Sequence, residues 1–170
     1  MNKLMILLMV LFGVQVASSQ NLTVNQLLEL SESNLAEVQE KLTADKWYFF
    51  HGRDASERRF GDVKFVYDTP DLNNPGNGAK YFLYYYYSDF EKAKAVEISF
   101  RIKEAYDLYV KQIENLKFKL VSSTTEKGNI LKVYKKGGFI IEVTLPPNFD
   151  DGKSYKFLFA EKSDYKKYRD

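Results

Sequence analysis

His51 is the only histidine of this 170-residue chain, and its neighbours Asp54 and Ser56 make it the first candidate for chemistry. The three residue types could form a Ser-His-Asp triad, in which the histidine takes a proton from the attacking serine. A triad usually draws its members from distant segments, whereas these residues crowd into one polar stretch, 51–57. We therefore predict an ordinary loop histidine and no catalytic residues.

Oxygen-bearing side chains in a stretch with glycine and proline could instead bind calcium, which takes about six to eight oxygen ligands. They are Asp68, Asp71, Asn73 and Asn74, with a weaker counterpart in Asp150 and Asp151. The spacing lacks the EF-hand pattern, and turn formation alone accounts for these residue types. A single histidine without cysteines gives little support to zinc. Phosphate-binding glycine loops and nucleotide fingerprints are also missing, so we predict neither a metal site nor a cofactor.

The most distinctive stretch is 80–88, whose interior is almost wholly aromatic. Such a run is typical of a central strand in an antiparallel sheet, with side chains alternating between the two faces. One face carries Tyr81, Leu83, Tyr85 and Tyr87, and the other carries Phe82, Tyr84 and Tyr86. The leucine favours the first set as the buried one, which places the second set on an open face. Because tyrosine is enriched in interfaces, that second set is the candidate binding surface. The alternative is that all these rings simply pack the sheet.

Capping signals and hydrophobic spacing indicate the elements around this strand. Thr23 with Gln26, and Asn34 with Glu37, form two capping-box patterns, which predict helices over about 23–31 and 34–44 or one helix kinked near Ser33. Apolar residues at helical spacing predict another helix over 103–115. Alternation predicts strands at 47–50, 60–67, 80–88, 95–102, from 118 onward, and at 130–135, 139–145 and 155–159. The charged tail, 161–170, is expected to fray.

These elements predict an α+β fold with a curved antiparallel sheet and helices packed on one face. Both halves read as a helical segment followed by four strands, at about 22–102 and 103–162. At matching points, Leu42, Lys46 and Trp47 parallel Ile113, Lys117 and Phe118. This parallel predicts two repeats within a single domain, although a helix followed by hairpins is also a common arrangement.

Small secreted proteins of unknown function from Bacteroidota are similar in pattern to this chain. The similarity rests on aromatic hairpins that follow the residues Leu27, Leu28, Glu29, Leu30, Ser33, Asn34, Val38, Leu42, Lys46 and Trp47. The tandem layout also resembles the β-lactamase-inhibitor protein, in topology only. Neither resemblance supplies functional residues, because a shared fold does not carry a shared function.

The first residues have the features of a signal peptide over 1–19. Lys3 precedes an apolar run over residues 5–14, and the small residues Ala17 to Ser19 follow it. We expect cleavage after Ser19, which leaves one domain over 20–170. An uncleaved anchor is the alternative, but the run is short for a bilayer. After cleavage we predict no stable membrane insertion and a periplasmic or secreted protein.

Charge and composition limit the classes of partner that we expect. Cleavage of the signal peptide removes Lys3 and lowers the net charge from +2 to +1. This near balance gives no reason to expect nucleic acid as a partner. The absence of cysteine excludes thiol catalysis and favours a bacterial source over a disulfide-rich secreted domain. We predict a non-catalytic binding or inhibitory module with a protein or glycan partner. The alternatives are an envelope structural or assembly factor and, less favoured, a hydrolase with acidic residues that the sequence does not identify.

Overall fold

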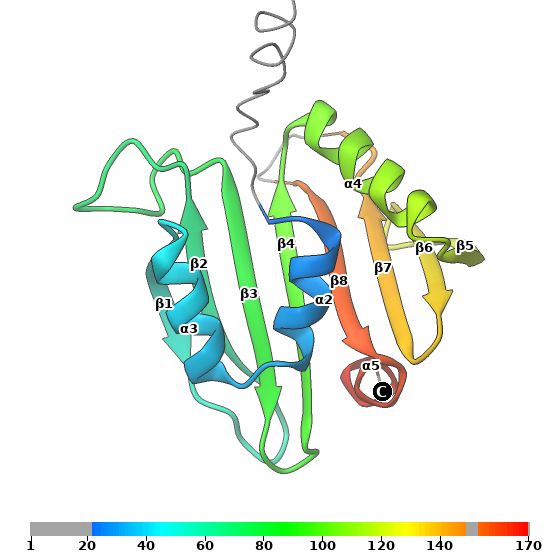
Figure 1. The fold of residues 1–170 in the computed structure, drawn as a ribbon, viewed down its shortest axis with the longest axis horizontal. Coiled ribbons are helices and arrows are strands. Elements are labelled where there is room, and N and C mark those ends of the chain that lie inside the picture. Colours follow the sequence, from blue (N-terminus) through cyan, green and yellow to red (C-terminus); the bar gives the residue numbers. More distant parts are fainter. Residues whose placement is uncertain (1–21, 149–152, 170) are drawn as a thin grey trace, which may run out of the picture.

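One eight-stranded antiparallel sheet forms the centre of the molecule (Figure 1). The computed structural model describes residues 22–148 and 153–169. The strands are β1 (Tyr48–Arg53), β2 (Gly61–Tyr67), β3 (Tyr81–Ser88), β4 (Ala93–Phe100), β5 (Lys119–Glu126), β6 (Asn129–Lys136), β7 (Phe139–Leu145) and β8 (Tyr155–Glu161). Their order, β1-β2-β3-β4-β8-β7-β6-β5, joins two four-stranded meanders through the antiparallel β4–β8 pair. The predicted α+β class with an antiparallel sheet is confirmed.

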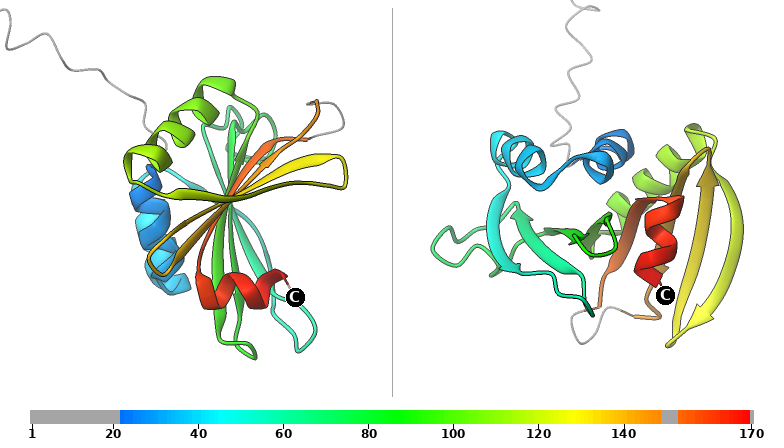
Figure 2. Two further views of the ribbon diagram at one scale, coloured as in Figure 1. Left: turned by 90° about the vertical axis from the view of Figure 1, so that its right-hand side faces the viewer. Right: turned by 90° about the horizontal axis from the view of Figure 1, so that it is seen from below.

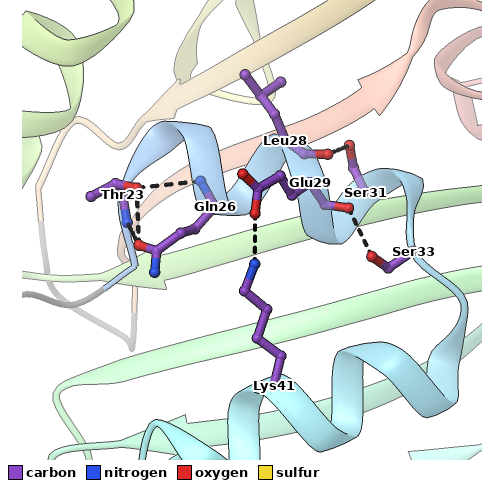
Figure 3. Close-up of polar contacts among 7 residues, drawn as sticks. All are labelled: Thr23, Gln26, Leu28, Glu29, Ser31, Ser33 and Lys41. Atoms are coloured by element: carbon purple, nitrogen blue, oxygen red, sulfur yellow. Dashed lines mark hydrogen bonds and ion pairs between the residues drawn. The ribbon is translucent and has the colours of Figure 1, made fainter.

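Two short helices precede the first meander, and both begin at the predicted capping boxes. Helix α2 spans Val24–Glu32 and α3 spans Leu35–Ala44. At the start of α2, the Thr23 hydroxyl accepts from the Gln26 backbone and the Gln26 side chain accepts from the Thr23 backbone at 2.8 Å (Figure 3). Lys41 joins the two helices by an ion pair with Glu29, with 2.6 Å between Nζ and Oε2. The chain therefore forms two separate helices that lie side by side.

The hydrophobic core lies between the sheet and three helices on one of its faces, α2, α3 and α4 (Lys103–Asn115), as Figure 2 shows. Leu27, Leu83 and Ile98 are fully buried there. Aromatic rings make up much of this core, because β4, β8 and α4 direct them toward one another. Tyr106 and Tyr155, for example, stack with 4.5 Å between ring centroids.

The aromatic strand β3 contributes to both faces, as its alternation predicts. Leu83 and Tyr85 are buried in the core, and Tyr81 and Tyr87 pack against it. The Tyr85 hydroxyl donates to the Ser33 carbonyl at 3.0 Å, which ties the centre of the sheet to the junction between α2 and α3. The predicted buried set therefore faces the helices, and Phe82, Tyr84 and Tyr86 face the other way.

The C-terminal tail is helical, so the expectation that it frays is wrong. Helix α5 (Lys162–Arg169) lies against β4, β7 and β8 on the face away from α2 (Figure 2). Its Tyr165 and Tyr168 pack on Ala95, Leu158 and Ala160, small and apolar residues of the sheet. Charged residues dominate the tail sequence, but two tyrosines at helical spacing pack on the sheet. Asp164 also accepts from the Lys94 backbone, and Arg169 pairs with Glu126.

The predicted signal peptide, Gln20, Asp150 and Asp151 lie outside the described residues. Within the described ranges, none of the helices is both long and apolar enough to span a bilayer. The internal repeat stays a prediction about sequence.

Candidate functional site

The sheet face opposite α2, α3 and α4 carries the three predicted binding residues, and we call it the open face. Cross-strand pairing arranges its side chains in rows. One row runs Phe82, Ser99 and Lys156 across β3, β4 and β8. The next runs Lys64, Tyr84 and Glu97 across β2, β3 and β4. The open face therefore mixes aromatic rings, cations and a carboxylate.

Helix α5 covers one part of the open face and divides the predicted residues. Tyr86 packs against Tyr168 of α5, with 5.2 Å between the ring centroids, and Phe60 meets the other side of Tyr168 edge-on at 5.5 Å. Burial raises the pKa of Tyr168 to about 12 and raises that of Tyr86 further. Tyr86 is therefore mainly a packing residue, whereas Phe82 and Tyr84 lie beyond the helix.

Lys64 sits at the centre of a cluster of rings on the uncovered part. Its ammonium lies 4.8 Å from the ring centroid of Phe82 and 5.0 Å from those of Tyr84 and Phe50. Such distances permit cation–π attraction to each ring. Tyr84 in turn stacks on Tyr86 at 5.8 Å with an interplanar angle of 7°. We call Lys64, Phe50, Phe82 and Tyr84 the lysine–aromatic cluster.

A groove of about 550 Å³ opens beside this cluster. It is bounded by β2, β3, the end of β4, the start of β8 and the loop residues 76–80. Phe82 and Tyr84 line it, together with Lys64, Lys80 and Arg101. We call it the first groove, and it brings two of the three predicted binding residues to one concave surface.

A second groove, of about 570 Å³, lies on the other side of the stacked tyrosines. Tyr86 and Tyr168 line it, with Arg53, Arg58, Arg59 and Lys167 as basic residues and Glu57 and Glu91 as acidic ones. Arg53 is already paired with Asp62, and the Lys167 ammonium donates to the Glu91 carbonyl at 2.6 Å. The second groove is thus more evenly charged than the first, because two acidic residues line it with the four basic ones.

Three buried carboxylates lie on the open face. Asp62 of β2, in register with Tyr86, pairs with Arg53. The other two are Glu97 on β4 and Glu142 on β7, each in register with Leu158 of β8. Glu97 Oε1 is 3.4 Å from Lys156 Nζ but accepts no hydrogen bond among the described residues. Glu142 Oε2 accepts a hydrogen bond from the Tyr165 hydroxyl at 2.6 Å. Burial raises the pKa of Glu97, and the nearby ammonium of Lys156 opposes this effect.

The other candidates from the sequence do not form a joint site. Ser56 lines the second groove, whereas His51 and Asp54 line neither groove. The expectation of a loop histidine is wrong, because β1 extends further than the predicted strand and includes His51. His51, Asp54 and Ser56 are all exposed. In the 68–80 loop, Asp68 pairs with Lys80 at 2.8 Å. Asp71 Oδ1 accepts from the backbone of Asn73 at 2.9 Å and of Asn74 at 3.2 Å, which is ordinary turn chemistry. Across residues 22–148 and 153–169, no group of three or more acidic or histidine side chains is placed to hold a metal.

Sequence reasoning missed the basic residues of the first groove. Alternation in β2 places Lys64 on the face opposite Val63 and Phe65, but the sequence does not reveal that this face adjoins Phe82 and Tyr84. That proximity depends on the β2–β3 register, which pairs Lys64 with Tyr84, and register is set by the whole sheet.

Comparison of this chain with protein-family models, with curated proteins and with solved structures found no match.

Proposed function

We propose that this chain is a secreted or periplasmic, non-catalytic binding module that holds a protein or glycan partner in the first groove. The observation that supports this proposal is the lysine–aromatic cluster, which places Phe82 and Tyr84 at the wall of an open groove. Aromatic side chains there are only partly buried, so they retain apolar area that a partner can cover.

A hydrolase is the alternative with a specific observation behind it, the buried pair of carboxylates that flanks Leu158. Glu97 and Glu142 are separated by one strand, or roughly 10 Å at the usual strand spacing. Neither lines the first or the second groove, and Glu142 is already bonded to Tyr165. Carboxylates that act on a substrate must reach it from a cleft, so binding without catalysis is the better supported function.

The test uses the mature chain from Gln20 as bait for the envelope fraction and culture medium of the organism that makes it. We expect wild type and Leu108→Ala to capture the same partner in the same amount, because Leu108 is exposed on α4 across the sheet. We expect Tyr84→Ala to lose that partner while the protein stays folded, with a melting temperature lowered by only a few degrees through the lost contacts with Lys64 and Tyr86. Equal capture by Tyr84→Ala and wild type would refute binding through this groove.

A further inference from the structure

The first groove has a one-sided charge. Among its lining residues four are basic and none of those described is acidic, although the whole chain is nearly balanced, with 25 basic and 23 acidic residues. The basic residues are Lys64, Lys80, Arg101 and Lys156. A concave surface with charge of one sign attracts ligands of the opposite sign.

Two of these four cations have no acidic partner within the described part of the chain. Lys80 pairs with Asp68 and Lys156 with Glu97. Lys64 and Arg101 make none of the ion pairs found among residues 22–148 and 153–169. Lys64 is held in place by the surrounding rings, so an anion that binds it does not need to order a mobile side chain first.

The basic residues of the first groove come from separate segments of the chain. Lys64 belongs to β2 and Lys156 to β8, with β3 and β4 between them. At the usual strand spacing the backbones of these two residues are about 14 Å apart, so an extended ligand reaches both sides of the groove more readily than one phosphate or carboxylate. In an extended peptide, side chains two residues apart are about 7 Å from each other on the same side. Carboxylates at alternate positions of such a peptide match the spread of the cations.

We propose that the ligand of the first groove is an extended acidic segment of a partner protein, whose carboxylates pair with Lys64 and Arg101. This inference rests on the proposed function and names the class of its ligand. A peptide suits the groove better than a sugar, because the Lys64 ammonium already faces the rings of Phe82 and Tyr84. Stacking of sugar rings on those aromatic faces would have to displace it.

Two short synthetic peptides test the chemistry, one with aspartate at every second position and one with asparagine in its place. We expect the full mature protein to bind the acidic peptide about tenfold or more tightly than the amide peptide, with binding that weakens as ionic strength rises. Equal affinities, or no binding of either peptide at millimolar concentration, would overturn the inference.

Charge-reversal variants locate the binding. Arg101→Glu changes an exposed residue and should weaken acidic-peptide binding about tenfold. Lys111→Glu, at an exposed position of α4 across the sheet, is the matched control and should leave it unchanged. Lys64→Gln provides a second variant within the groove. Unchanged affinity in both groove variants would place the peptide elsewhere and overturn the inference.

An acidic oligosaccharide, oligogalacturonate, separates this inference from the proposed function. Binding of the oligosaccharide without binding of the acidic peptide would overturn the peptide assignment and leave a binding module with a glycan ligand. Capture that is insensitive to Tyr84→Ala would instead refute the proposed function itself. The two failures are therefore distinguishable.

Discussion

Replacing Lys64 with methionine tests whether its ammonium stabilises the sheet through the surrounding rings. Methionine keeps an unbranched side chain over the rings and removes only the charge and its attraction to them. The ammonium lies between 4.8 and 5.0 Å from the centroids of Phe50, Phe82 and Tyr84. A partly exposed cation gains roughly 0.5–1 kcal/mol from one ring.

The three contributions do not add fully, because one ammonium cannot face every ring in its best geometry. Methionine also gains some apolar contact with the same rings. We therefore expect Lys64→Met to lower the free energy of unfolding by about 1 kcal/mol, which corresponds to about 2–4 °C in melting temperature for a domain of this size.

Urea unfolding followed by the fluorescence of Trp47 measures this loss, because Trp47 is the only tryptophan and is buried in the core. Lys132→Met is the matched control, since Lys132 is also a half-buried strand lysine but does not lie over an aromatic ring among the described residues. An unchanged or higher urea midpoint for Lys64→Met, relative to the control, would refute the stabilising role of the cluster. A changed slope of the transition would instead indicate a different denatured state.

Three further changes test other parts of the structure. Gly61→Ala should lower the free energy of unfolding by about 1–3 kcal/mol, because an added Cβ would lie 2.6 Å from the Tyr87 ring and 2.7 Å from a backbone nitrogen. Gly138→Ala is the control: its added Cβ would meet no atom within 4 Å, so it should be near neutral in the same urea assay. Glu97→Gln should stabilise the protein at neutral pH, and the gain should shrink as pH falls from the raised folded-state pKa of Glu97 toward the ordinary glutamate value. The reason is that a raised folded-state pKa makes wild-type stability fall as pH rises; thermal melts over a pH series measure this, and a constant difference would contradict it. Asn34→Ala removes the acceptor for the Glu37 backbone at the start of α3 and should lower stability by about 1 kcal/mol; an unchanged melting temperature would show that packing alone holds this helix.

The local elements follow directly from the sequence. Both capping boxes form where their residues predict them, since a cap depends only on a few neighbouring residues. The predicted strands all form, because apolar alternation depends on the residues of each strand itself. The choice of Leu83 and its neighbours as the buried face is also confirmed.

Errors arose where an element depends on a distant surface. The tail over 161–170 is too charged to predict a helix by itself, yet Tyr165 and Tyr168 attach it to the sheet beside Tyr86. The same contact removes most of Tyr86 from the open surface. The formation of α5 cannot be predicted from the tail alone, and the burial of Tyr86 cannot be predicted from β3 alone. The tail and the sheet each provide the apolar area that the other covers.

The candidate site divides in the same way. The face of β3 that carries Phe82, Tyr84 and Tyr86 can be predicted from the residues of that strand, because side-chain direction in a strand follows from the backbone pleat. That Lys64, Arg101 and Lys156 share a groove with two of these rings depends on the folded sheet. Lys64 belongs to β2, Lys156 belongs to β8 and Arg101 follows β4. Strand order and register, which bring them together, result from burying the core of the whole chain.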